Sequence, residues 1–384
     1  MERRTFLQAA AALAGAAWLR VPRLARADNE TGQLYELTSR PANYEATRNT
    51  FTTRITPLDR FYLRNHFDIP VGDPATWATS WKLELKGLVA KPATFTLADL
   101  EKMKQTTVEA VLQCAGNGRG LFTPHVAGVQ WRYGAMGNAE WTGVRLATIL
   151  AAAGVDMKAA KYVAVQGMEK PTLEATPPFV RGIPLEKAIH PDTLVALQMN
   201  GKPLSPMHGY PARLVVPGWV ADDWIKWLTM IEVRADEPKG FWYETGYRFP
   251  VTPGKPGEAI PPDQMKPMTK LFVKSLIGSI SDGDVVAPGK RELVGVAFSG
   301  EATIKKVDVT LDGGATWQAA KLDGKDSQYG FRVFKYAWDA KPGTYKIGSR
   351  ATDSAGAVQP ATPIWNPSGY LYNAIDIANV EVKA

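Results

Sequence analysis

The chain has 384 residues, enough for about two domains, and its composition of 45% hydrophobic and 22% charged residues is that of an ordinary globular protein. Its 28 prolines and 34 glycines follow no period, which excludes a collagen-like fibre and favours a sheet-rich fold with many loops. The one cysteine, Cys114, excludes an internal disulfide, a multi-cysteine zinc or iron–sulfur site and a CxxCH haem attachment. Any redox chemistry therefore requires another cofactor.

Residues 1–27 have the features of an export signal. Arg3 and Arg4 precede an alanine-rich apolar stretch, and Ala25-Arg26-Ala27 offers a cleavage site. The paired arginines followed by Phe6-Leu7 are similar to a twin-arginine signal, whose route exports folded proteins, so we expect a periplasmic protein. The alternative is an amphipathic anchor that stays attached. No later stretch approaches the ~18 apolar residues that span a bilayer, so no membrane span is expected after signal removal.

Removal of this segment also changes how the charge is interpreted. The formal charge of +7 comes from 45 basic and 38 acidic residues, and residues 1–27 hold five arginines and one glutamate. Without them, 40 basic residues face 37 acidic ones, a net charge of +3. The sequence therefore gives little support to a nucleic-acid-binding surface, and we expect no nucleic-acid partner.

Residues 28–250 mix strands and helices without strict alternation, which predicts an irregular α+β domain. Strands are expected within residues 81–89, 161–167, 211–218 and 224–233. A capping signature from Thr96 to Asp99 predicts a short helix in residues 94–103. A second, amphipathic helix is expected in residues 145–155, ended by Gly154.

The segment Pro250–Pro267 contains six prolines and predicts a stiff extended connector, with the linker proper over residues 251–267. In residues 268–384, an alternation of apolar and polar residues runs into the turn Asp312-Gly313-Gly314 and resumes at Trp317. This pattern predicts a hairpin. Further strands are expected in residues 329–338 and 343–353. This pattern predicts an immunoglobulin-like β-sandwich domain, of a kind that usually pairs or supports rather than catalyses.

The segment from Val108 to Gly120 carries the most chemical information. Alternation places Val108, Ala110, Leu112 and Cys114 on one face of a strand, with a glycine-rich turn directly after the thiol. Arg119 is expected to favour the thiolate, a soft anionic ligand at the mouth of a site. Two alternatives remain open, a buried cysteine that only ends a strand and a nucleophile with His125 or His208 as its base. The segment lacks both the dinucleotide fingerprint and the phosphate-loop spacing.

The chain resembles the sulfite oxidase family of molybdenum enzymes in separated motifs that follow the family's order. They are LQCAGN at Leu112–Asn117, FYLRNH at Phe61–His66, HGYPAR at His208–Arg213, and the C-terminal LDGGATWQ and PIWNP. The resemblance implies a mixed molybdopterin domain followed by an immunoglobulin-like dimerisation domain. It also implies that the cofactor is molybdenum bound to molybdopterin, with Cys114 as the protein's thiolate ligand to the metal.

The resemblance further implies the roles of other residues. It places four in the substrate pocket and catalysis: Arg64, Arg119, Trp131 and Tyr247. It assigns the cofactor to a larger set: Tyr62, Leu63, Arg64, Asn65, His66, Cys114, Glu169, His208, Arg213, Trp224, Ile225 and Lys226. Two positions depart from the family: Ser368 stands where animal and plant members have a pocket arginine, and Glu169 stands at the position of a pterin-contacting aspartate.

The expected reaction is the oxidation of sulfite to sulfate by oxygen transfer, with sulfite held by Arg64 and Arg119. Residues 28–50 are too short for a haem domain and contain no histidine. An external c-type cytochrome is therefore the expected electron acceptor, and a homodimer through the C-terminal domain is implied. Two alternatives remain: a molybdenum-dependent reductase of sulfoxides or related acceptors, and an exported binding protein without enzymatic activity.

Overall fold

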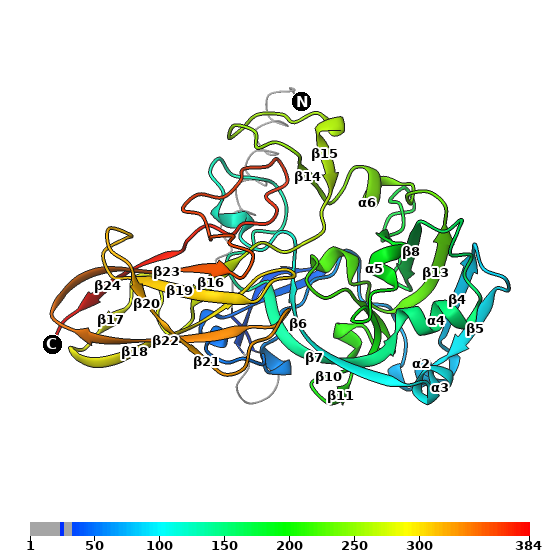
Figure 1. Ribbon diagram of the computed structural model, residues 1–384, viewed down its shortest axis with the longest axis horizontal. Coiled ribbons are helices and arrows are strands. Elements are labelled where there is room, and N and C mark those ends of the chain that lie inside the picture. The colour runs from blue at the N-terminus through cyan, green and yellow to red at the C-terminus, as the bar shows by residue number, and fades with distance from the viewer. Residues whose placement is uncertain (1–23, 27–32) are drawn as a thin grey trace, which may run out of the picture.

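The computed structural model of the chain describes residues 24–26 and 33–384. The predicted export signal lies almost entirely outside these residues. Two bodies lie side by side, a larger mixed domain formed by the first two thirds of the chain and a C-terminal sandwich (Figure 1). No helix in the described part of the chain combines the length and the apolar character needed to cross a membrane.

Two five-stranded sheets form the N-terminal domain. One has the order β11-β10-β7-β6, with β12 paired to β10, and the other has the order β5-β4-β13-β8-β9. The first sheet contains β6 (Gln105–Gln113), β7 (Met136–Arg145), β10 (Leu194–Met199), β11 (Lys202–Pro203) and β12 (Arg213–Val215). The second contains β4 (Lys82–Gly87), β5 (Ala93–Thr96), β8 (Tyr162–Gly167), β9 (Val180–Pro184) and β13 (Leu228–Arg234).

A smaller sheet and short helices complete this domain. The sheet joins β1 (Leu24–Arg26), β2 (Gln33–Ser39) and β3 (Ala42–Ala46). The α-helices are α2 (Pro74–Ser80), α3 (Leu97–Lys102), α4 (Leu146–Ala152), α5 (Leu185–Ala188) and α6 (Phe241–Glu244). Short 3-10 helices are η1 (Arg48–Thr52), η2 (Leu58–Arg60), η3 (Arg119–Leu121), η4 (Pro206–His208) and η5 (Ala221–Asp223).

Local sequence explains where the predicted helices begin and end. The Thr96 hydroxyl accepts from the Asp99 amide, while the Asp99 carboxylate accepts from the Thr96 amide, so α3 begins with a capping box. After α4 the chain turns at Gly154, whose φ of +67° is open to glycine at little cost. Both predicted helices are confirmed.

The C-terminal domain packs two sheets face to face around an apolar core, and their strands pair in antiparallel fashion except for β17 with β24. One sheet contains β16 (Lys274–Ile277), β18 (Gly289–Phe298), β21 (Lys321–Asp323) and β22 (Arg332–Ala340). The other contains β17 (Val285–Val286), β19 (Ile304–Thr310), β20 (Gln318–Ala319), β23 (Gly343–Asp353) and β24 (Ile377–Val382). β19 and β20 pair as the predicted hairpin, with Asp308 opposite Ala319. The predicted α+β domain followed by a sandwich is confirmed.

The proline-rich segment differs from the prediction. Instead of running extended between the domains, it folds back, because β14 (Arg248–Pro250) pairs in antiparallel fashion with β15 (Met265–Pro267). The 3-10 helix η6 (Pro262–Gln264) precedes β15. Prolines occupy strand ends here, where a missing amide does not interrupt a central ladder. The prediction of a stiff extended connector was therefore wrong.

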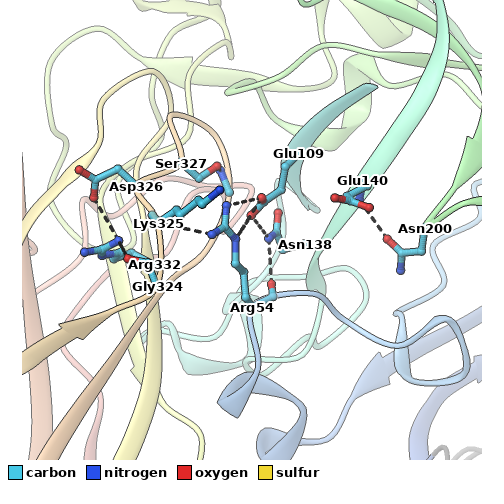
Figure 2. A network of polar contacts seen from close by, with 11 residues as sticks. Arg54, Glu109, Asn138, Glu140, Asn200, Gly324, Lys325, Asp326, Ser327 and Arg332 are labelled. Carbon is cyan, nitrogen blue, oxygen red and sulfur yellow. Dashed lines mark hydrogen bonds and ion pairs between the residues drawn. The ribbon is translucent and has the colours of Figure 1, made fainter. Parts of the chain in front are cut away.

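Loops of the sandwich close the free edge of β6. Arg54 forms an ion pair with Glu109 on β6, with its Nε 2.9 Å from Oε1, and its Nη1 donates to the Lys325 carbonyl at 3.3 Å (Figure 2). Farther along β6, the Val111 amide donates to the Tyr329 carbonyl at 2.8 Å. The C-terminal domain thus holds the strand that ends at the cysteine.

Candidate active site

The only cysteine lies at the end of β6, as predicted. Its amide donates to the Ala135 carbonyl at 2.9 Å, and its carbonyl accepts from the Asn117 amide at 2.9 Å, which closes a turn. Gly118 follows with a φ of +91°, a left-handed conformation that favours glycine. Both faces of the strand are covered at this end, because Val111, Leu112, Gln113 and Cys114 are all buried.

A cavity opens beside Cys114. The predicted residues in its wall are Tyr62, Leu63, Arg64, His66, Cys114, Glu169, His208, Arg213, Trp224, Ile225, Lys226 and Tyr247. They come from loops and strand ends that are far apart in the sequence. Asn65 lies just behind the wall, where its side chain accepts a hydrogen bond from Lys226 and its amide donates to Asn43 Oδ1 at 2.9 Å.

One end of the cavity collects buried cationic and donor groups. His208 is held by a contact of 2.8 Å between its Nδ1 and Ser205 Oγ, and its Nε2 has no partner among the described residues. Arg213 donates to the carbonyls of His208 and Trp224 at 3.0 and 3.1 Å, while its Nε is also unpaired within the described chain. Unpaired buried donors are unfavourable unless a ligand accepts from them. A phosphate group provides such acceptor oxygens.

Titration of these groups supports the same interpretation. Burial, aided by Arg213 and Lys226, lowers the pKa of His208 to about 3. Burial likewise lowers the pKa of Lys226 to about 7, opposed by Glu169. The pKa of Arg213 falls to about 10, again through burial. Burial, together with mutual repulsion, disfavours positive charge on these three groups, so an anion placed between them would favour their protonated forms.

Glu169 is the carboxylate of this part of the wall. Burial raises its pKa, although Lys226, Arg64 and a hydrogen bond with the Phe67 backbone favour the ionised form. Its extra methylene relative to aspartate does not remove it from the cavity. Its contact with a cofactor stays a prediction.

Tyr247 is positioned by contacts on several sides. Its backbone has a φ of +57°, and its hydroxyl forms a hydrogen bond with His66 Nε2. Its ring stacks on Tyr370 with centroids 5.5 Å apart, and the Arg181 guanidinium lies 5.2 Å from the ring centroid. Burial lowers the pKa of His66 well below its usual value, so a neutral imidazole faces the tyrosine. A tyrosine held this way presents its hydroxyl in a fixed direction.

Two residues predicted to line the substrate pocket lie behind its wall. Arg119 Nε donates to the Ser368 carbonyl at 2.9 Å, and its Nη1 donates to the Val129 carbonyl at 3.1 Å. Backbone carbonyls thus accept from two of the nitrogens of this guanidinium. Trp131 is fully buried and packs edge-on against Tyr62 with centroids 6.2 Å apart. This geometry does not place either side chain in the cavity, and their contact with substrate stays a prediction.

The Cys114 thiol keeps its proton to a higher pH than the nearby arginines would suggest. Burial raises the pKa of Cys114, and the opposing effects of Arg64 and Arg119 do not reverse this. A coordinated metal would remove the proton outright. The alternative of a cysteine nucleophile gains no support, because His125 is exposed and neither histidine forms a hydrogen bond with the thiol in the described structure.

Several wall residues were not predicted. Asp222 and Phe179 line the cavity, and Tyr370 of the sandwich domain stacks behind Tyr247. The sandwich therefore supports the site from behind its wall, as expected for such a domain. Asp222 lies two positions before the predicted cofactor residues Trp224, Ile225 and Lys226, and this proximity in the sequence could have indicated it. The other two have no local signature in the sequence.

Comparison with known proteins identifies the family. Residues 66–242 match the oxidoreductase molybdopterin binding domain, and residues 265–382 match the Mo-co oxidoreductase dimerisation domain. Sulfite oxidase of Arabidopsis thaliana is 34% identical over 86% of this chain and 89% of its own length. Human mitochondrial sulfite oxidase is 35% identical over 90% of this chain, which spans only 65% of the human protein.

A solved structure shows the same architecture. The sulfane dehydrogenase SoxCD from Paracoccus pantotrophus superimposes with a TM-score of 0.78, at 26% identity, over 94% of this chain and 90% of that one. The orphaned donors of His208 and Arg213 and the thiol at the cavity wall fit a pterin phosphate and a soft metal. The chain therefore belongs to the sulfite oxidase family of molybdopterin oxidoreductases.

Proposed function

We propose that the protein oxidises sulfite to sulfate with a molybdenum–molybdopterin cofactor. The observation that carries this proposal is one cavity in which the Cys114 thiol shares the wall with Arg64, a cation that is left for a substrate anion when Arg213 and Lys226 hold the cofactor phosphate. Sulfite is a small hydrated anion, so its desolvation in a buried site requires fixed positive charge and donors. A neutral sulfoxide needs no such charge, which favours sulfite over the sulfoxide-reductase alternative. Family membership favours an enzyme over a binding protein.

The chain's residues would divide into two groups around the bound cofactor. His208, Arg213 and Lys226 would hold its phosphate, while Cys114 would ligate the metal. When bound, the cofactor supplies oxygen-atom transfer and takes up two electrons. Arg64 would hold the substrate anion, and the Tyr247 hydroxyl, fixed by His66, would hydrogen-bond to substrate or product. The overall reaction consumes sulfite and water and yields sulfate, two protons and two electrons.

The surroundings of the enzyme are part of the proposal. Export by the twin-arginine route would place the folded enzyme in the periplasm, where an external c-type cytochrome would accept the electrons one at a time. The C-terminal domain would pair two copies into a homodimer, as the description of the matching domain suggests.

A combined assay tests the proposal. Protein made in a host that synthesises molybdopterin should contain molybdenum and should reduce oxidised cytochrome c only when sulfite is added. Protein from a host without the pterin pathway serves as the control. Reduction of a sulfoxide by a reduced dye, without sulfite-dependent cytochrome reduction, would instead support the reductase alternative, and absence of molybdenum would contradict both.

A second candidate substrate comes from the structural neighbour. SoxCD is a sulfane dehydrogenase, and its fold covers nearly the whole of this chain. Oxidation of a sulfane sulfur would use the same oxygen-transfer chemistry. Comparison of cytochrome reduction with sulfite and with a sulfane-sulfur compound, at equal concentrations, separates the two substrates.

A further inference from the structure

A buried ion triad adjoins the cavity. Arg181 on β9 faces two consecutive carboxyl groups on η5, with Asp222 Oδ2 at 2.8 Å and Asp223 Oδ1 at 3.0 Å from its Nη2. All three side chains are only 1% exposed. One guanidinium cannot neutralise two carboxylates, and an uncompensated buried charge is strongly unfavourable. The triad is therefore expected to retain a proton.

The two carboxyl groups are not equivalent. Asp223 also accepts from Arg181 Nε at 3.1 Å, whereas Asp222, apart from its ion pair with Arg181, accepts no hydrogen bond from another described residue. Asp222 lines the cavity, and Asp223 does not. Burial raises the pKa of Asp222 to about 8 and that of Asp223 to about 6, with Arg181 opposing both shifts. The retained proton thus belongs on Asp222.

A protonated carboxyl group changes what this wall can bind. As an acid it offers an O–H donor to an oxyanion, whereas as a carboxylate it would repel one. We propose that Asp222 is kept as a neutral acid by Arg181 and Asp223, donates a hydrogen bond to the oxyanion bound in the cavity, and weakens anion binding when it loses its proton. This inference rests on the proposed function of the same site.

Other groups near Asp222 must be considered before a pH effect is assigned to it. Arg181 and Asp223 face it within the triad, and Asp222 acts electrostatically on Tyr62, Cys114, Tyr247 and Tyr370. Burial raises the pKa of each of these four groups, so they stay neutral without a metal. Lys226, with a pKa of about 7, shares the cavity and also loses positive charge as pH rises. Substitution of Asp222 is therefore needed to separate the two effects.

The test uses sulfate as the probe, because its charge does not change across the neutral and alkaline range. Calorimetric titration of the holoenzyme with sulfate should give a dissociation constant that rises with pH. Above the Asp222 pKa of about 8 the rise approaches about tenfold per pH unit if only the protonated form binds. In Asp222→Asn, a neutral isostere, this limb should disappear and any residual dependence on Lys226 should remain.

Asp223→Asn is a matched variant that should favour ionisation of Asp222, whereas Asp222→Asn removes that ionisation. With Asp223 neutral, Arg181 has one carboxylate left to pair with, so Asp222 should ionise more readily. The loss of sulfate affinity should then begin at lower pH than in the wild type. If this variant does not fold, Asp222→Asn alone decides. An alkaline limb that is unchanged in Asp222→Asn would overturn the inference.

Infrared spectroscopy supplies a readout that needs no turnover. The wild-type spectrum at neutral pH should contain the C=O stretch of a protonated buried carboxyl group that Asp222→Asn lacks, and absence of this difference would overturn the inference. If the wild type oxidises sulfite but shows no such band, the proposed function stands and the inference about Asp222 is wrong. If the wild type has the band but neither oxidises sulfite nor binds sulfate, both the proposed function and the hydrogen bond from Asp222 to the anion are wrong.

Discussion

Replacement of Arg181 by methionine tests the physical account of the buried triad through protein stability. The change removes the cation beside Asp222 and Asp223 while it keeps much of the side-chain volume. Because Asp223 has a pKa of about 6, its ionisation beside Arg181 makes the native state at pH 7 about 1.4 kcal/mol more stable than a native state in which Asp223 must stay neutral, as expected without Arg181. The charged hydrogen bond from Arg181 Nε contributes about 1.5–3 kcal/mol more. We expect a loss of about 3–5 kcal/mol in the free energy of unfolding.

The pH dependence has a definite sign. Asp222 and Asp223 have native pKa values above their unfolded ones, so at this pair the native state binds more protons, and the pair's contribution to wild-type stability falls as pH rises from about 4 to about 8. At pH 5 the wild-type Asp223 is itself mostly protonated, and its ionisation no longer contributes. The difference between wild type and Arg181→Met should therefore shrink by about 1–2 kcal/mol at pH 5.

The assay is equilibrium urea unfolding at pH 5 and pH 7, followed by tryptophan fluorescence on cofactor-free protein so that cofactor loading does not differ. Arg248→Met is the matched control, because Arg248 donates to the carbonyls of Tyr243 and Met265 rather than pairing with this carboxylate pair. The loss of stability caused by Arg248→Met should not shrink at pH 5 as the loss caused by Arg181→Met does. An Arg181→Met variant as stable as the wild type at pH 7 would refute the reasoning.

Three further predictions concern the cavity and the loop beside it. Cys114→Ser should lose bound molybdenum and sulfite-dependent activity with an unchanged circular dichroism spectrum, and full activity would refute the ligand assignment. Gly118→Ala should destabilise the protein by about 2–5 kcal/mol, because the added Cβ would lie 2.5 Å from the Tyr372 Cβ at a left-handed φ. Gly201→Ala, also left-handed but with nothing within 4 Å, should lose only about 1–2 kcal/mol by thermal or urea unfolding. Cofactor uptake by cofactor-free protein should weaken as pH rises through about 7, where Lys226 loses its charge. Lys226→Met should lack this dependence. Equal pH profiles of uptake for the wild type and the variant would contradict the assignment of Lys226 to the phosphate.

Local sequence determined the elements whose causes are local. The capping box of α3 needs only Thr96 and Asp99, three residues apart, and the end of α4 needs only a glycine at the left-handed position. Alternation and turn chemistry likewise predicted the β19–β20 hairpin. The position of Cys114 at a strand end followed from the same rules, since a glycine-rich turn cannot continue a strand. Motifs with short spacing also indicated the family.

Other features depend on contacts between distant segments, and only the tertiary structure decided them. The fold-back of the proline-rich segment depends on the pairing of β14 with β15, and the withdrawal of Arg119 from the cavity depends on the Ser368 carbonyl of the other domain. The Arg181 triad joins residues about forty positions apart, and no local pattern marks them as partners. The chain itself thus supplied the thiol and the cationic groups. Which of them face one cavity, and which side chain there keeps a proton, follows from burial and proximity, which exist only once distant segments of the chain have packed together.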